Sequence, residues 1–121
     1  MWSIQFKSGK PQGNDELLSS VYYPDIMKKY LEEDLRMIQR VKKYQFRAVG
    51  WTDDKECAGT ECEALSMRRA KLVTDWFVKR GIPHDSFVAP QGRGSYFGPN
   101  YSPTENERPG GRRVDIELAE P

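Results

Sequence analysis

The feature that most constrains this chain is an arginine within the apolar face of a predicted helix. The pattern of residues 60–80 predicts a helix that carries Leu65, Leu72 and Val73 on one side, and at about 100° per residue Arg69 lies near the middle of that arc. An unpaired buried charge is very costly, so a guanidinium at this position needs an anionic partner or a polar cleft. The fold must supply one of the two.

Asp53 is the nearest candidate in the sequence for lining the same cleft. The alternation of residues 44–51 predicts a strand, and Asp53 follows at its carboxyl end, ahead of the predicted helix. An Asp and an Arg that face each other across a groove could hold the ammonium and the carboxylate of one zwitterionic ligand. The alternative is a structural salt bridge, and the spacing alone does not decide between the two.

Length and composition narrow the classes of protein to consider. A chain of 121 residues fits a single domain, residues 1–121, that can bury a core without a metal. Charged residues make up 31% of the chain, and positive and negative charges nearly balance, with a net charge of +1. The protein as a whole therefore carries no charge that would attract nucleic acid or a membrane surface. No apolar run approaches the roughly 20 residues of a membrane span. Met1 leads straight into a strand-like segment, so we expect either a domain excised from a longer protein or a mature chain that has been given a start codon.

The two cysteines, Cys57 and Cys62, are separated by four residues. They cannot form a tetrahedral zinc site alone, and the only histidine, His84, lies well downstream. A local disulfide is the simplest interpretation, and it would indicate an oxidising compartment. A reduced pair in a cytosolic protein is the alternative. A redox motif is less favoured, because such motifs use two intervening residues.

The rest of the pattern predicts a two-layer α/β sandwich of order β-α-β-α-β-loop-β, with two helices over one face of the sheet. The expected elements are strands at residues 2–6, 44–51, 86–89 and 114–118, a helix from Pro24 to about residue 41, and a second helix to about residue 80. Thr60 and Glu63 form a capping-box pattern at the start of that second helix. The irregular segment 90–113 is expected to hold one helical turn near residues 104–108.

Catalytic patterns are not found. No nucleophile, base and orienting group occur at a recognised spacing. Asp53 and Asp54 are adjacent, so on an extended backbone their side chains would diverge instead of flanking a glycosidic bond. We expect no enzyme activity, no cofactor and no metal.

Three motifs occur in a fixed order along the chain: Gly50-Trp51-Thr52-Asp53, then Leu65-Ser66-x-x-Arg69-Ala70, then Arg112-Arg113-Val114-Asp115-Ile116. Together they resemble the OmpA-like peptidoglycan-binding domain family, which includes the C-terminal domain of outer-membrane protein A, peptidoglycan-associated lipoprotein and flagellar stator-type proteins. The resemblance covers residues 46–118 well and the first forty-odd residues in outline.

This resemblance implies non-covalent, non-catalytic binding of peptidoglycan through the diaminopimelate of the stem peptide. Asp53 would engage the amino group of the ligand, and Arg69 would grip its carboxylate with a planar fork. Leu65 would pack beside the site and Thr52 would add a contact. One of the two arginines that enter the last strand, taken here as Arg113, would line the cleft.

The resemblance also implies a cellular location and binding partners. We expect the periplasm of a Gram-negative bacterium, with a tether to a membrane through an N-terminal region outside this sequence and no membrane insertion by the domain itself. The expected partner is the peptidoglycan stem peptide, with other envelope proteins as further partners. RNA binding on an open sheet face is disfavoured by the near-neutral charge and by the lack of an RNP-like aromatic strand.

Four positions depart from the family pattern: Trp51, where His or a small polar residue is common; Cys62 and Gly111, where Asn is usual; and Lys7, where an acidic residue is typical. These departures favour a second hypothesis, an OmpA-like domain that has lost ligand binding and serves as a protein-interaction module in an envelope or secretion assembly. The retained pair, Asp53 and Arg69, favours ligand binding.

Overall fold

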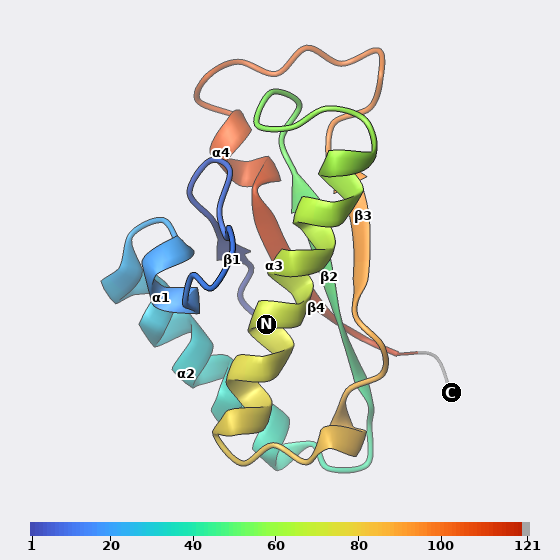
Figure 1. The fold of residues 1–121 in the computed structure, drawn as a ribbon. Helices are drawn as coiled ribbons and strands as arrows, with labels where there is room; N and C mark the ends of the chain where they lie inside the picture. Colours follow the sequence, from blue (N-terminus) through green and yellow to red (C-terminus); the bar gives the residue numbers. More distant parts are fainter. Residues whose placement is uncertain (120–121) are drawn as a thin grey trace.

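The computed structural model describes residues 1–119 and contains a four-stranded sheet covered by two long helices (Figure 1). The elements follow in this order: β1 (Ile4–Gln5), α1 (Leu17–Ser20), α2 (Pro24–Arg40), β2 (Phe46–Thr52), α3 (Thr60–Lys79), a 3-10 turn (His84–Ser86), β3 (Gln91–Ser95), α4 (Arg108–Gly111) and β4 (Arg113–Leu118). Within residues 1–119, no helix is both long and apolar enough to cross a membrane.

The sheet has the strand order β1-β4-β2-β3. β4 runs antiparallel to both β1 and β2, whereas β3 runs parallel to β2 at the sheet edge. A parallel pair needs a crossover connection, and α3 lies in the one between β2 and β3. The chain therefore leaves the carboxyl end of β2, passes through the loop 53–59 and enters α3 close to that same end of the sheet.

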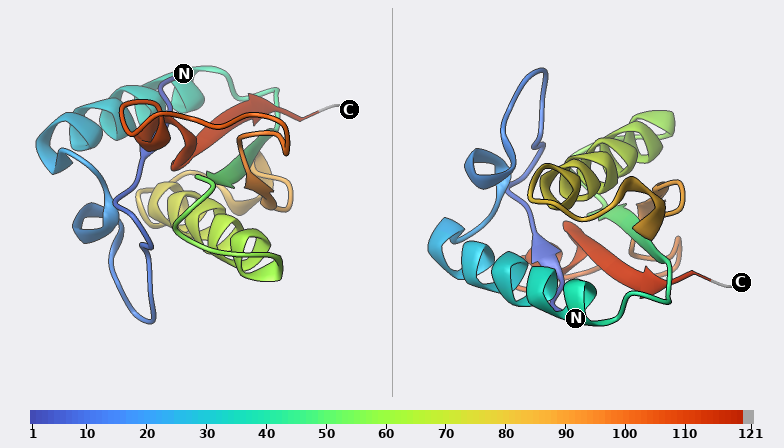
Figure 2. Two further views of the ribbon diagram at one scale, coloured as in Figure 1. Left: turned by 90° about the horizontal axis from the view of Figure 1, so that it is seen from above. Right: turned by 90° about the horizontal axis from the view of Figure 1, so that it is seen from below.

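Both long helices contribute to one core on one face of the sheet. The core joins apolar residues of α2, α3 and the strands: Met27, Leu31, Ile38, Ala70, Val73, Phe77, Ile4, Phe46, Ala48 and Val114. The two end-on views in Figure 2 show α2 and α3 alongside the strands. The alternate positions of the strands, which include Arg47, Trp51, Arg93 and Asp115, belong to the opposite face. The α/β two-layer arrangement expected from the sequence is confirmed.

α3 approaches the sheet very closely where two glycines face it. A Cβ placed on Gly50 would lie 1.9 Å from the carbonyl oxygen of Ser66, and one placed on Gly92 would lie 2.5 Å from the backbone nitrogen of Met67. The Ser66 hydroxyl also accepts a hydrogen bond from the Gly94 N–H at 3.0 Å. This contact holds Arg69, one turn further along α3, against the end of β2.

The third strand is not at residues 86–89, as the sequence predicts, but at Gln91–Ser95. Residues 84–86 form the 3-10 turn, and Phe87 makes only an isolated bridge to Phe46. β3 is glycine-rich for two reasons. A Cβ at Gly92 would collide with the backbone of α3, and Gly94 has a φ of +72°. Its sequence therefore has little of the β-branched and apolar character used to predict strands.

Two helix boundaries also differ from prediction. Gly59, at φ +57°, is the N-cap of α3, and it makes no side-chain cap hydrogen bond, so the predicted capping box of Thr60 and Glu63 is wrong. Thr60 is already the first helical residue, because the glycine turn starts the helix one position earlier. The helical turn expected near residues 104–108 is α4, four residues that begin at Arg108.

Candidate functional site

Arg69 is fully buried, and its anionic partner is Glu56 rather than Asp53. The two side chains are both 0% exposed. Arg69 Nη2 donates to Glu56 Oε1 at 2.5 Å, and Nη1 donates to Oε2 at 2.9 Å. This is the bidentate geometry in which a guanidinium binds a carboxylate most strongly. The charge on the apolar face of α3 is therefore neutralised from the loop 53–59.

The backbone takes up the remaining donors of Arg69. Its Nε donates to the carbonyl oxygen of Lys10 at 2.7 Å, Nη1 to that of Trp51 at 2.8 Å and Nη2 to that of Lys7 at 3.2 Å. A guanidinium has five N–H donors, and all five are engaged when the two bonds to Glu56 are included. Lys7 and Lys10 belong to the loop after β1, so this loop closes over the arginine.

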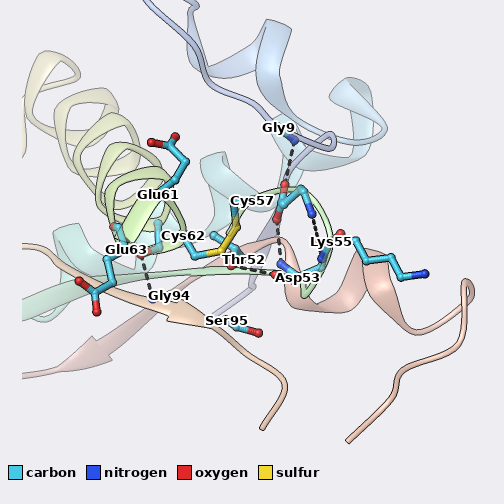
Figure 3. The surroundings of a disulfide bond; sticks show 12 residues. Gly9, Thr52, Asp53, Lys55, Cys57, Glu61, Cys62, Glu63, Gly94 and Ser95 are labelled. Atoms are coloured by element: carbon cyan, nitrogen blue, oxygen red, sulfur yellow. Dashed lines mark hydrogen bonds between the residues drawn. A yellow bond between two sulfur atoms is a disulfide. The ribbon is translucent and has the colours of Figure 1, made fainter. Parts of the chain in front are cut away.

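The Glu56 carboxylate is equally well satisfied. Besides its bonds to Arg69, Oε1 accepts the N–H of Gly9 at 2.8 Å and Oε2 accepts the N–H of Asp53 at 2.8 Å. We call the Arg69 guanidinium and the N–H groups of Gly9 and Asp53 the carboxylate cradle. Figure 3 shows Gly9 and Asp53, which come from two different loops. Four donors therefore converge on the two oxygens of one carboxylate.

Asp53 shapes the loop that carries Glu56. Its side chain is nearly inaccessible, and the residue is 2% exposed. Oδ1 accepts the N–H groups of Lys55 at 2.8 Å and of Glu56 at 2.7 Å, while Oδ2 accepts Arg112 Nη1 at 2.8 Å. A short Asp that binds the amides two and three residues ahead folds the backbone into a tight turn. This turn directs Glu56 back toward Arg69.

The other predicted site residues separate into two groups. Thr52 is buried and its hydroxyl donates to the Asp53 carbonyl at 2.9 Å, and Leu65 is buried on α3, so both lie at the end of β2 or beside it. Arg113 does not join them: its Nε donates to Asp115 at 3.2 Å and its guanidinium lies 4.1 Å from the Tyr96 ring centroid. Its neighbour Arg112 is the arginine that reaches the site.

The loop 53–59 is fastened at two more points. Cys57 and Cys62 form a disulfide, as predicted, which ties the residue after Glu56 to the first turn of α3 (Figure 3). On the other side, Arg108 Nε of α4 donates to Asp54 at 2.9 Å, and this hydrogen bond lowers the pKa of the Asp54 carboxyl. The loop is thus held by covalent and ionic contacts on both flanks of Glu56.

A shallow depression of about 370 Å³ lies over the disulfide. Its lining includes Asp54, Glu63, Arg93 and the cysteines, but neither Asp53 nor Arg69. Among residues 1–119, no group of three or more His, Cys, Asp or Glu side chains is arranged to hold a metal. In this conformation the carboxylate cradle is enclosed by the loops 7–13 and 53–59.

Sequence reasoning missed Glu56, and it named Arg113 where Arg112 is the arginine that contacts Asp53. A signal for Glu56 was present: Arg69 requires a carboxylate, and the loop after β2 carries Asp53, Asp54 and Glu56. The short aspartate is taken up by the turn that it caps, which leaves the longer glutamate to reach the guanidinium. Which of two adjacent arginines reaches the site depends on the register of β4 against β1, in which Arg113 pairs with Gln5.

Comparison with solved structures identifies the fold. The peptidoglycan-associated lipoprotein of Burkholderia pseudomallei superposes with a TM-score of 0.73 at 18% identity, over 97% of this chain and 89% of that chain. The C-terminal domain of MotB from Helicobacter pylori gives a TM-score of 0.75 at 18% identity, over 100% and 86%. The OmpA-like domain of FopA1 from Francisella tularensis gives 0.66 at 16% identity, over 98% and 74%. No family model and no curated protein matches the chain.

Proposed function

From its OmpA-like fold, we propose that this chain is a non-catalytic domain that binds peptidoglycan and anchors an envelope protein to the cell wall. One of the similar structures is a peptidoglycan-associated lipoprotein, and another is the C-terminal domain of MotB. The disulfide between Cys57 and Cys62 fits an oxidising compartment such as the periplasm. The ligand that we assign is the diaminopimelate of the stem peptide.

The carboxylate cradle carries this proposal. A diaminopimelate side chain ends in an amino-acid centre, with an ammonium and a carboxylate on one carbon. Arg69 and the N–H groups of Gly9 and Asp53 already bind a carboxylate with four hydrogen bonds. The Asp53 carboxylate lies next to this cradle and is the acceptor for the ammonium, in place of Arg112. Leu65 and Thr52 support the two charged residues from α3 and β2.

Co-sedimentation with purified sacculi tests the proposal. Wild type should pellet with sacculi that contain diaminopimelate and pellet less with sacculi that contain lysine at that position, because lysine lacks the second carboxylate. Asp53→Asn and Arg69→Lys should lose at least about tenfold in binding, a cost of about 1.4 kcal/mol, since each removes a charge-assisted contact. Arg36→Lys, on the exposed side of α2, is the matched control. Equal pelleting by all four folded proteins would overturn the site assignment.

A second function is favoured by one observation, namely that all five donors of Arg69 are already engaged within the chain. A domain closed in this way could serve as a protein-interaction module in an envelope assembly. This alternative predicts that neither wild type nor any folded variant pellets with sacculi of either composition.

A further inference from the structure

We infer that Glu56 is an internal ligand of the carboxylate cradle, so that an external carboxylate binds only after Glu56 has left. This inference rests on the proposed function, and it assigns a regulatory residue to the same site. Glu56 is fully buried, and both of its oxygens are bound by the donors that would receive a ligand carboxylate. The two carboxylates therefore compete for one set of hydrogen bonds.

The two partners of the buried pair differ in how easily they can move. Arg69 comes from the middle of α3, a helix of twenty residues that is packed against the glycines of β2 and β3. Glu56 comes from the loop 53–59, whose backbone belongs to no helix or strand. Its turn is held by the two N–H bonds to Asp53 Oδ1. The disulfide and the bond from Arg108 to Asp54 fasten the two flanks of the loop, so the part that moves is the Glu56 side chain.

Displacing the Glu56 side chain breaks its bonds to Arg69 and to the N–H groups of Gly9 and Asp53. Displacing Arg69 would in addition break the packing of α3 against the sheet.

This competition weakens the apparent affinity in a calculable way. The apparent dissociation constant equals the intrinsic one divided by the fraction of molecules in which the cradle is empty. If Glu56 occupies the cradle about 99% of the time, the domain binds about a hundredfold more weakly than the empty cradle would. Removing the internal carboxylate should therefore tighten binding, the opposite of what removal of a ligand-contacting residue does.

The first experiment measures sacculus binding by wild type, Glu56→Gln and Glu56→Ala. Glu56→Gln keeps the size of the side chain but turns one oxygen into a donor that faces the guanidinium, so it should half-saturate at a protein concentration at least about tenfold lower than wild type. Glu61→Gln is the matched control, because Glu61 is an exposed carboxylate in the first turn of α3 that pairs with Arg68. The control should bind as wild type does.

The second experiment has a readout that does not involve peptidoglycan. Glu56→Ala leaves a buried guanidinium beside a space of carboxylate size, so sodium acetate should bind there and raise the melting temperature. Sodium chloride at equal ionic strength should not, and the melting temperature of wild type should respond equally to the two salts. Because Glu56→Ala risks unfolding, it is also refolded in acetate, and Glu56→Gln is melted in parallel.

Each outcome decides one point. Acetate-specific stabilisation of Glu56→Ala together with tighter sacculus binding by Glu56→Gln supports the inference. Acetate-specific stabilisation without pelleting by any protein supports internal competition in the cradle and overturns peptidoglycan as the ligand. Pelleting by wild type as strongly as by Glu56→Gln, or no response to acetate, overturns the inference. Failure of both variants to fold even in acetate also overturns it, because Glu56 is then an obligatory structural residue.

Discussion

Buried charges in this domain are stabilised by backbone groups as much as by opposite charges. Arg69 uses three carbonyl oxygens, Glu56 two N–H groups and Asp53 two more. A buried ion pair alone often fails to repay its desolvation, and additional hydrogen bonds make the difference. The pair at the site is thus a stable arrangement, and removal of either partner leaves the other buried and unpaired.

Asp34 on α2 lacks such support. It is 1% exposed, its Oδ1 accepts the N–H of Trp2 at 2.9 Å, and its Oδ2 has no partner within residues 1–119. Burial raises the pKa of the Asp34 carboxyl to about 6, and the hydrogen bond from Trp2 opposes that rise. The folded state therefore holds this proton more tightly than the unfolded state does.

Stability should accordingly fall as pH rises through this range. The contribution of protonated Asp34 is full below the unfolded pKa of 3.8 and is lost as pH rises through about 6. Asp34→Asn should remove this dependence and be more stable than wild type at pH 7.5 by about 1 to 3 kcal/mol, with little difference at pH 4. Urea denaturation of both proteins from pH 4 to pH 8 measures the free energy of unfolding at each pH. Parallel pH profiles would contradict the prediction.

At the scale of elements, the contact between α3 and the sheet is set by the absence of side chains at two positions. Gly50→Ala would place a methyl group 1.9 Å from the Ser66 carbonyl oxygen. Neither backbone can yield cheaply, so the free energy of unfolding should fall by about 3 kcal/mol. Gly98→Ala is the control, because nothing lies within 4 Å of that position. Chemical denaturation should show no more than a small change for the control, and equal losses would contradict the close contact.

The disulfide of Cys57 and Cys62 stabilises the loop 53–59. It joins residues five positions apart, and closing so short a loop should contribute about 2 kcal/mol in the chain-entropy description. Reductant should lower the free energy of unfolding of wild type by about that amount. The double variant Cys57→Ser/Cys62→Ser should already be less stable and should not respond to reductant. Free thiols in a protein purified without reductant would contradict the assignment.

At the scale of the whole molecule, the sequence predicts the architecture better than it predicts the edges of the elements. The helices at Pro24–Arg40 and Thr60–Lys79 and the strands at Phe46–Thr52 and Arg113–Leu118 follow from the periodicity of their residues. β3 could not be found in this way. Gly92 is required by the close approach of α3, which is a tertiary contact. Such a contact produces no alternation of apolar and polar residues in the sequence.

The candidate site was predicted in part for a similar reason. The need of Arg69 for a carboxylate follows from its position on α3. Asp53, Thr52 and Leu65 are buried, and their roles toward a ligand stay predictions. The identity of the partner does not follow, since it depends on the path of the loop after β2 and on the length of each acidic side chain. Likewise, the role of Arg112 requires the register of β4 against β1.

The loop after β1, which closes over Arg69, affects the order in which the domain can fold. Its bonds to Arg69 and Glu56 connect residues 47 to 62 positions apart in the chain. Contacts of such long range cost loop-closure entropy before they return any stability, and they tend to form late in folding. Residues 7–10 are synthesised before α3, so the site can assemble only when this loop meets the middle of the domain.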